Sequence, residues 1–236
     1  MAALAIQSIT DILGQNSATQ LSVTGGTSPY TWSIVAGGVG GSVSSSGLYV
    51  SPLSSGTVTV KVTDSLSAVV TKTLTVCSTL ELVCEIIKHE MGLASDQVYI
   101  YNQKIAPIKD ERLYVSLRVD SLKPFGVTRR GSDIEDLSVN MQATISIDIV
   151  SRTTEALFKK EQVLLALSSS FSHRVQNANA FHISRLSHGF VDLSNIEGAS
   201  IPYRFNIALN ILYVVTNQKS SEYYDTFQDV GVEIEA

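Results

Sequence analysis

Residues 69–92 read VVTKTLTVCSTLELVCEIIKHEMG, and this stretch contains the change that decides the fold. Its first part alternates apolar and polar side chains with the period of two that a half-buried strand requires. Ser78 and Glu81 then have the spacing of a capping box, which starts a helix. Apolar residues follow at helical spacing, and Gly92 supplies a C-terminal stop. A strand that runs directly into a helix predicts a domain boundary at residue 77 with a very short linker.

The two sides of this boundary differ in composition. Up to residue 77 the chain has only four charged side chains, together with nine of its fifteen glycines and 25 Ser or Thr residues. All of the net charge of −5 lies in residues 78–236. Two compositions in a chain of 236 residues predict two domains, 1–77 and 78–236, each long enough for its own core. The acidic balance argues against a surface for duplex DNA.

Residues 18–76 contain six or seven short strand patterns separated by turn residues. Val58, Val60 and Val62 alternate with polar side chains, as in a strand with one buried face. Glycine-rich breaks fall at residues 25–26 and 37–41. Short strands with such turns and no helical period predict an antiparallel β-sandwich.

The same segment resembles the immunoglobulin-like domains of bacteria and phages. The resemblance rests on GGTSPYTWSI at 25–34, GLYVSP at 47–52 and GTVTVKVTDS at 56–65. It implies an all-β immunoglobulin-like sandwich, with Trp32 packed in the core between the two sheets. Such domains decorate capsids, tails and surface proteins, so the resemblance leaves the partner open.

Residues 78–236 are expected to form an α+β domain with an antiparallel or mixed sheet and helices on one face. Strand patterns cover residues 98–101, 113–119, 139–150 and 203–215, and the last two have one apolar and one polar face. Residues 124–131 are expected to form a loop or an extended hairpin arm. A helix capped by Ser151 is expected over 152–171, followed by a polar loop at 172–180 and a short strand at 181–187. The segment 217–236 is a polar, acidic tail, either solvated or reaching a neighbouring ring.

This order of elements resembles the tail terminator and neck (collar) proteins of tailed bacteriophages. The resemblance rests on the long strand at 141–150 that leads into RTTEAL at 152–157, on FVDLSNIEG at 190–198 with YRFNI at 203–207, and on YYDTF at 223–227. It implies a structural virion protein, assembled in the host cytoplasm, that forms a ring at the head–tail neck. The ring would terminate the tail tube, by occupying its terminal strand edges, and join it to the head connector.

The resemblance also implies the partners. They are further copies in a hexameric or dodecameric ring, the tail tube and the sheath proteins, the head–tail connector, and genomic DNA that passes through the lumen without specific binding. Long strands with polar outer faces suit contacts around a closed ring. The candidate assembly residues are Arg129, Arg130, Asn140, Gln142, Asp148, Arg204, Asn206, Tyr223 and Tyr224.

Arg129 and Arg130 are the sharpest local charge feature, and two interpretations of them stay open. They contact DNA in a central channel, or they form salt bridges with the acidic residues at 133, 135 and 136. The salt bridges are favoured, because opposite charges this close in sequence pair easily and a channel should let DNA slide.

The sequence indicates neither an enzyme nor a cofactor. It lacks a phosphate loop, Gly-x-Ser-x-Gly and His-Glu-x-x-His. Cys77 and Cys84 are expected to be buried, reduced thiols. The histidines at 173, 182 and 188 lack the short spacing of a metal site. Asp192, Ser194 and Glu197 are typical of turn caps, which is favoured over an acidic catalytic pair.

The sequence contains no run of 18 apolar residues, so no membrane span is expected. Residues 1–8 lack the features of a signal peptide. We therefore expect folding in a cytoplasm. The alternative function is a capsid or tail decoration, or a host-adhesion module, that acts through the immunoglobulin-like domain. That alternative predicts a monomer or a trimer.

Overall fold

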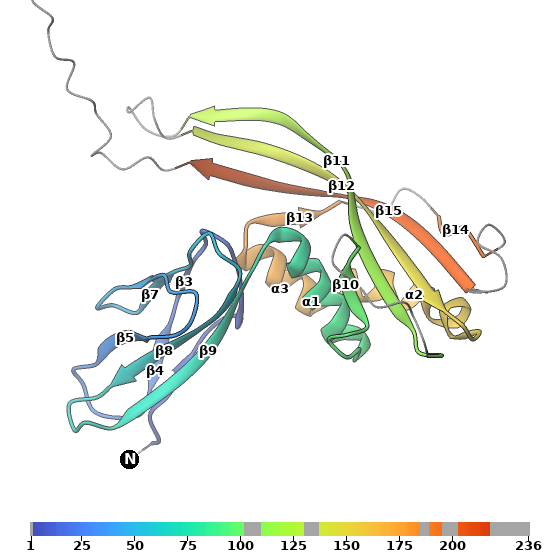
Figure 1. Cartoon of the computed structure of the whole chain (residues 1–236). Coiled ribbons are helices and arrows are strands. Elements are labelled where there is room, and N and C mark those ends of the chain that lie inside the picture. Colours follow the sequence, from blue (N-terminus) through green and yellow to red (C-terminus); the bar gives the residue numbers. More distant parts are fainter. Residues whose placement is uncertain (1, 102–109, 130–136, 185–188, 195–202, 218–236) are drawn as a thin grey trace, which may run out of the picture.

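The computed structural model describes residues 2–101, 110–129, 137–184, 189–194 and 203–217. They form two bodies, a β-sandwich up to Cys77 and a larger sheet with helices from Ser78 onward (Figure 1). Each body has its own cluster of buried apolar side chains. The described chain is therefore mostly β-sheet with few helices.

Nine short strands build the sandwich. They are β1 (Ala5–Gln7), β2 (Ile12–Gly14), β3 (Ala18–Gln20), β4 (Ser22–Thr24), β5 (Thr31–Val35), β6 (Ser42–Val43), β7 (Leu48–Val50), β8 (Gly56–Thr63) and β9 (Val69–Cys77). One sheet has the order β2-β9-β8-β5 and the second β3-β7-β6, while β1 pairs with β4. The edge pair β2–β9 is parallel and the other pairs are antiparallel. The predicted sandwich is confirmed.

Two aromatic side chains of the sandwich core, Tyr49 and Trp32, differ in burial. Tyr49 is fully buried, and its hydroxyl donates a hydrogen bond of 2.7 Å to the carbonyl of Gly40. Trp32 is paired with the buried Val62, so its indole points to the core side of β5 and packs against the core, as predicted, although it is only half-buried. The reason is its strand: β5 lies at the edge of the four-stranded sheet, where only one flank is covered by a neighbour.

Helix α1 (Thr79–Met91) begins and ends where the sequence predicts. Ser78 and Glu81 form the capping box, and Gly92 ends the helix in the left-handed conformation with a φ of 63°. The buried face is wider than the predicted stripe, because Leu82 and Ile86 are also fully buried. The physical reason is that α1 packs against helices, against the large sheet and against the sandwich strands β2 and β9.

The large sheet is mixed. Its strands are β10 (Val98–Ile100), β11 (Tyr114–Arg129), β12 (Leu137–Ser151), β13 (Phe181–Ile183), β14 (Val191–Asp192) and β15 (Tyr203–Asn217). The order is β10-β11-β12-β15-β13, with β14 also paired to β15. Only β10 and β11 are parallel. The helices cover one face of this sheet (Figure 1).

The helix expected over 152–171 is in fact two helices, α2 (Glu155–Leu167) and α3 (Ser170–Ala178). The loop expected at 172–180 was therefore wrong for most of its length. Its polar residues are satisfied inside the structure: Ser172 Oγ donates to the carbonyl of Leu167 at 2.7 Å, and Gln176 Nε2 donates to Ser172 Oγ at 2.9 Å. Ser169 caps α3 by accepting a hydrogen bond of 3.0 Å from the N–H of Ser172. The serines at 168–170 supply a second N-cap, Ser169, which explains why the expected single helix is broken into α2 and α3.

The long strands exceed their predicted bounds. β11 runs to Arg129 and pairs with β12 up to Leu137, so residues 124–129 form the extended hairpin arm, one of the two expected forms, and not a loop. β12 includes Ser151, which ends a strand instead of capping α2, and Thr154 occupies the N-cap position of that helix. β11, β12 and β15 continue past the helices as a three-stranded extension, which we call the arm (residues 121–129, 137–142 and 212–217; Figure 1).

Candidate functional site

The structure divides the predicted assembly residues into two groups. Asn140 and Gln142 lie on the arm and are half-buried, and the backbone of Arg129 pairs with that of Leu137 at the end of the β11–β12 ladder. Asp148, Arg204 and Asn206 lie together at the other end of β12 and β15. Three predicted residues, Arg130, Tyr223 and Tyr224, are outside the described residues, as are the acidic residues at 133–136.

Asp148 is the centre of a polar cluster on the face of the sheet opposite the helices. Asn206 Nδ2 donates to its carboxylate at 2.9 Å, and the guanidinium of Arg204 lies 3.3 and 3.4 Å from its two oxygens. Asp148 is only 2% exposed. A carboxylate this buried must be paired to be tolerated. Asp148 therefore holds β12 to β15 within one chain and is too buried to belong to the predicted assembly surface.

The cluster belongs to a row of polar residues across four strands. The register aligns Tyr99 of β10, Ser116 of β11, Asp148 of β12 and Asn206 of β15. Burial, followed by the nearby negative charge of Asp148, raises the pKa of the Tyr99 hydroxyl. Sequence reasoning found the members on β12 and β15 from their alternation. It missed Tyr99 and Ser116, because only the strand register brings them to this row.

A second pair of charges lies beside this row. Arg118 Nε donates to Asp120 at 2.9 Å, and Asp120 also accepts a hydrogen bond from Ser146. Both charged side chains of the pair are partly exposed. Further along, Thr144 Oγ1 donates to Asn210 at 2.8 Å. The polar face is thus internally paired, with little unbalanced charge among the described residues.

An exposed ion cluster lies at the end of β11 away from the arm. Arg112 donates to Asp110 at 2.7 Å and to Asp96 at 2.8 Å, and the hydroxyl of Tyr114 donates to Asp110 at 2.9 Å. The hydrogen bond from Arg112 lowers the pKa of the Asp96 carboxyl. These residues are oppositely charged and mutually satisfied, which is typical of a structural surface cluster.

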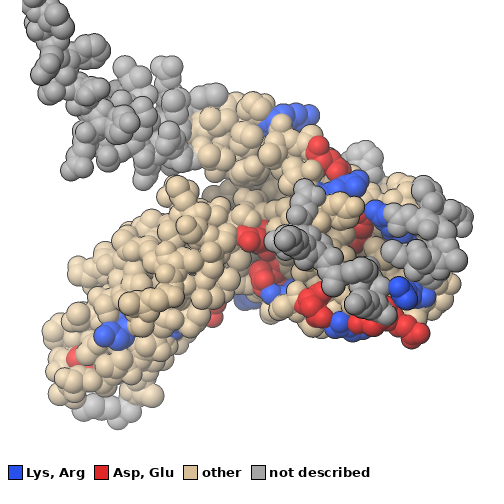
Figure 2. Space-filling view, in the orientation of Figure 1, with Lys and Arg blue, Asp and Glu red and all other residues tan. Residues whose placement is uncertain are grey.

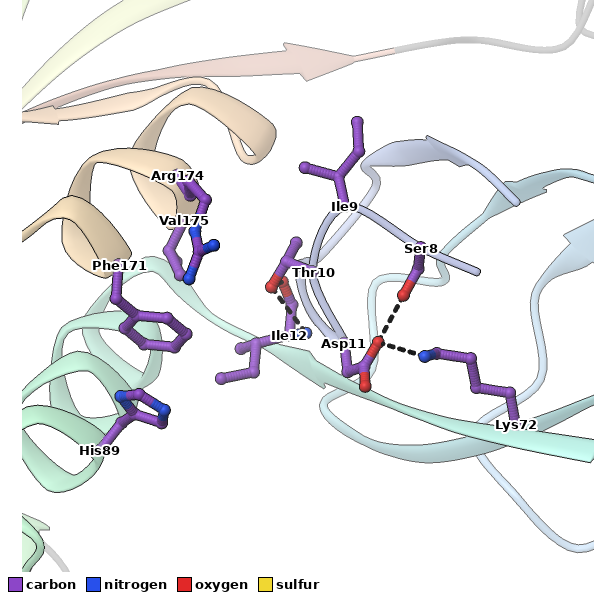
Figure 3. A pocket seen from close by; sticks show the side chains of 10 residues that line it. All are labelled: Ser8, Ile9, Thr10, Asp11, Ile12, Lys72, His89, Phe171, Arg174 and Val175. Atoms are coloured by element: carbon purple, nitrogen blue, oxygen red, sulfur yellow. Dashed lines mark hydrogen bonds and ion pairs between the residues drawn. The ribbon is translucent and has the colours of Figure 1, made fainter. Parts of the chain in front are cut away.

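A pocket of about 360 Å³ lies where the two bodies meet (Figure 3). On one side the imidazole of His89 stacks on Phe171, with ring centres 3.9 Å apart, and Arg174 lies 5.8 Å from the same ring. On the other side Lys72 pairs with Asp11 at 2.9 Å. The residues that line it are Ser8, Ile9, Thr10, Asp11, Ile12, Lys72, His89, Phe171, Arg174 and Val175. The carboxylate of Asp11 is engaged by Lys72, and Nδ1 of His89 lies 3.1 Å from a carboxylate oxygen of Glu90.

The two thiols are buried, and one of the three histidines considered above, His188, lies outside the described residues. Cys77 and Cys84 are unpaired and buried, as predicted, and burial raises the pKa of each thiol to about 12. Within the described residues no group of three His, Cys, Asp or Glu side chains could hold a metal ion. Asp192 accepts a hydrogen bond of 2.9 Å from the backbone N–H of Ser194, as in a turn cap, whereas Glu197 lies outside the described residues.

None of the helices in the described part of the chain is long and apolar enough to cross a membrane.

Comparison with known proteins identifies no family for the chain. No family model matches it, and no curated protein matches it. Among solved structures, it is similar to the crystal structure of an EHEC O157:H7 intimin mutant, with 15% sequence identity and a TM-score of 0.28. The alignment covers 51% of this chain and 52% of the other, so the chain spans about half the length of that structure. A likeness of this size supports no functional conclusion.

Proposed function

We propose that this chain is a structural, non-enzymatic protein of a tailed-phage virion that forms a ring at the head–tail neck. There it terminates the tail tube and meets the head connector. The observation that carries the proposal is the arm, a three-stranded extension of the sheet beyond its own helices. Several apolar side chains on the arm are exposed, among them Leu122 and Phe125. Apolar surface on an extension of this kind favours contact with another protein chain.

The free edge of the arm supports a role in termination. Within the described residues, the outer side of β11 pairs only with the short strand β10, at residues 115–117. Among those residues, the part of β11 that belongs to the arm has no neighbour on that side. Its register shifts between Val119 and Ser121 and again between Pro124 and Gly126. Bulges and a proline on an edge strand hinder the addition of a further strand. We infer that copies meet through faces of the arm and that the edge of β11 resists continued strand addition.

The sandwich is positioned as a decorating domain would be. It extends away from the large sheet, and its visible surface carries few charges (Figures 1 and 2). Its strand order, with a parallel edge pair in a four-stranded sheet opposite a three-stranded one, supports an immunoglobulin-like sandwich. In the proposed ring the large sheet makes the contacts between copies and the sandwich projects outward.

The remaining partners belong to the same proposal. The tail tube and the sheath would contact one side of the ring and the head connector the other. Genomic DNA would pass through the lumen without specific binding. The pairing of charges on the polar face agrees with this, because a phosphate-binding surface needs unpaired basic side chains.

The test is the mass of the full chain in solution, measured by light scattering over a range of concentrations, with electron microscopy of the same samples and of samples mixed with tail tubes. A closed ring of six or twelve copies, alone or on the tube end, supports the proposal. A chain that stays monomeric under both conditions contradicts it.

The second candidate is a decoration or adhesion module that acts through the sandwich. The observation that favours it is the exposure of two leucines in the loops before and after β8, Leu53 at 76% and Leu66 at 66%. Charged substitutions at these two positions would then abolish attachment to capsids or host cells and leave the oligomeric state unchanged. In the proposed ring, whose contacts lie on the large sheet, the same substitutions would leave both ring formation and docking to tail tubes intact.

A further inference from the structure

We propose that the pocket between the two bodies binds residues 218–236 of the same chain, which we call the acidic segment. This segment lies outside the described residues. The pocket, of about 360 Å³, is lined by the loop between β1 and β2, by Lys72 of β9, by the end of α1 and by one side of α3 (Figure 3). A contact of this kind lies within one copy, so it goes beyond the proposed ring and does not depend on it.

The size and the place of the pocket are those of a binding site. Ligand pockets commonly have volumes of roughly 300–1,000 Å³ and often lie where two domains meet. Ile9, Ile12 and Phe171 give this pocket an apolar lining, and Ile9 is 71% exposed. His89 stacks on Phe171 and pairs with Glu90, which does not itself line the pocket. The apolar side chains would therefore gain from contact with a bound segment.

The pocket has an excess of positive charge, although the net charge of the chain is −5. Lys72 and Arg174 line it, against the carboxylate of Asp11. That carboxylate is 2.9 Å from Lys72. The guanidinium of Arg174 lies 5.8 Å from the ring centre of Phe171, and among the described residues it has no ion pair and no hydrogen bond. The pocket thus offers a cation that a further carboxylate can pair with.

The acidic segment has the complementary chemistry. Its acidic residues are Glu222, Asp225, Asp229, Glu233 and Glu235, and its one basic residue is Lys219. Residues 232–235 read VEIE, in which apolar and acidic side chains alternate. In an extended backbone such alternation turns the carboxylates to one side and the apolar side chains to the other. The pocket offers both cationic and apolar side chains to a segment of this pattern.

The acidic segment is long enough to reach the pocket of its own chain. β15 ends at Asn217, and Tyr213, about 13 Å earlier on this strand, pairs with Phe181 of β13. The pocket residue Val175 precedes Phe181 by six residues, which span at most about 20 Å. Asn217 and the pocket are therefore at most roughly 40 Å apart. Glu233 is 16 residues beyond Asn217, a reach of more than about 50 Å.

A segment bound in this pocket would contact both bodies at once. Lys72 belongs to the sandwich, whereas Arg174 belongs to α3 and the large sheet. The bound segment would therefore brace the sandwich against the helices. This place differs from both interpretations of the tail that the sequence left open, in solvent or on a neighbouring ring.

The experiment is cross-linking of the full chain with a carbodiimide, which joins a carboxylate directly to an amine that it contacts. Lys72 is the one lysine that lines the pocket. It should be joined to carboxylates of the acidic segment and also to Asp11, its partner at 2.9 Å. Mass spectrometry of the digested chain identifies both products. A mixture of chains with and without heavy-isotope label distinguishes links within one copy from links between copies.

Arg174→Glu is the test variant. It replaces the unpaired cation with a carboxylate, and like charges repel, so the product with the acidic segment should fall about tenfold or more. The product that joins Lys72 to Asp11 should persist and so establishes that the variant folds with the pocket intact.

Lys61→Glu is the matched control, with the same change of charge. Lys61 lies on β8 between the buried residues Val60 and Val62, so it points to the outer face of the sandwich. This variant should leave both products unchanged. A link from Lys72 to Asp11 alone, a segment product that persists in Arg174→Glu, or segment links only between labelled and unlabelled chains would each overturn the proposal. The proposed ring is tested separately by the mass of the wild-type chain.

Discussion

The side-chain carbonyl of Asn179 accepts a hydrogen bond of 2.5 Å from the backbone N–H of Gly14, although the two residues are 165 positions apart. Asn179 Nδ2 also donates to the carbonyl of Ile12 at 3.3 Å. One amide at the end of α3 thus binds both ends of strand β2. On the other side of the junction Ser55 donates to Glu81 of α1 at 2.8 Å. The sandwich is therefore fastened to the helices and does not simply follow a linker.

Replacing Asn179 should loosen this junction. In Asn179→Ala the N–H of Gly14 loses its acceptor, which should cost about 1–2 kcal/mol of unfolding free energy. Limited proteolysis between the bodies should also become faster. Ser55→Ala, whose bond to Glu81 is exposed, is the control and should change both readouts little. Equal effects of the two variants would contradict a central role for Asn179.

The buried pair of Arg204 and Asp148 should be far more sensitive than an exposed pair. Arg204→Met leaves the carboxylate of Asp148 buried without its cation, and should lower the unfolding free energy by about 3–5 kcal/mol. Arg118→Met, which breaks the partly exposed pair with Asp120, should cost about 1 kcal/mol or less. Urea denaturation of the two variants measures the difference. Similar losses would show that burial does not distinguish the pairs.

The two thiols predict how stability changes at alkaline pH. Burial, aided by nearby glutamates, raises the pKa of Cys77 and Cys84 from 9.0 to about 12 in the folded chain. The unfolded chain therefore loses these protons first, and the thiols should lower the stability progressively between pH 9 and pH 12. Below pH 9 they should have no such effect.

Denaturation curves at a series of pH values measure this slope, and Cys84→Ala should make it shallower. A thiol reagent at pH 8 should modify neither cysteine in the native chain and both in guanidinium. Rapid labelling of the native chain would contradict the burial of the thiols.

Gly47 should not tolerate a side chain. Its φ is +84°, and a Cβ there would lie 2.9 Å from the indole of Trp32. Gly47→Ala should therefore destabilise the sandwich by about 1–3 kcal/mol and shift the fluorescence of Trp32. Gly189→Ala, where a Cβ meets nothing within 4 Å and φ is ordinary, is the control and should be neutral. An unshifted emission in Gly47→Ala would contradict the close contact.

Local patterns were enough for much of the fold. The capping box at Ser78 and the stop at Gly92 predicted α1 within a residue, because caps and helical spacing are encoded by neighbours in sequence. The alternation of β8 and of β12 likewise predicted which faces are buried. By contrast, the polar residues Ser172 and Gln176 suggested a loop, since their hydrogen bonds inside the core are invisible to a reading of composition.

The predicted assembly residues show the same division. Alternation placed Asn140, Gln142 and Asp148 on one face of β12, and the structure agrees. Alternation could not distinguish Asp148, which is buried by its pairing with Arg204, from residues on the arm. Nor could it show that Leu122 and Phe125 of the arm are exposed, because the exposure of an apolar residue depends on which neighbours cover it.

The sequence by itself determined the division at residue 77, the sandwich, helix α1 and the long amphipathic strands, because each follows from periods and caps that span a few residues. Only the tertiary structure decided the strand register that aligns Tyr99 with Asp148 and the hydrogen bonds that bind Asn179 to strand β2. It also decided how far the arm extends beyond the helices. These depend on contacts between residues far apart in the chain, whose free energies no local pattern contains.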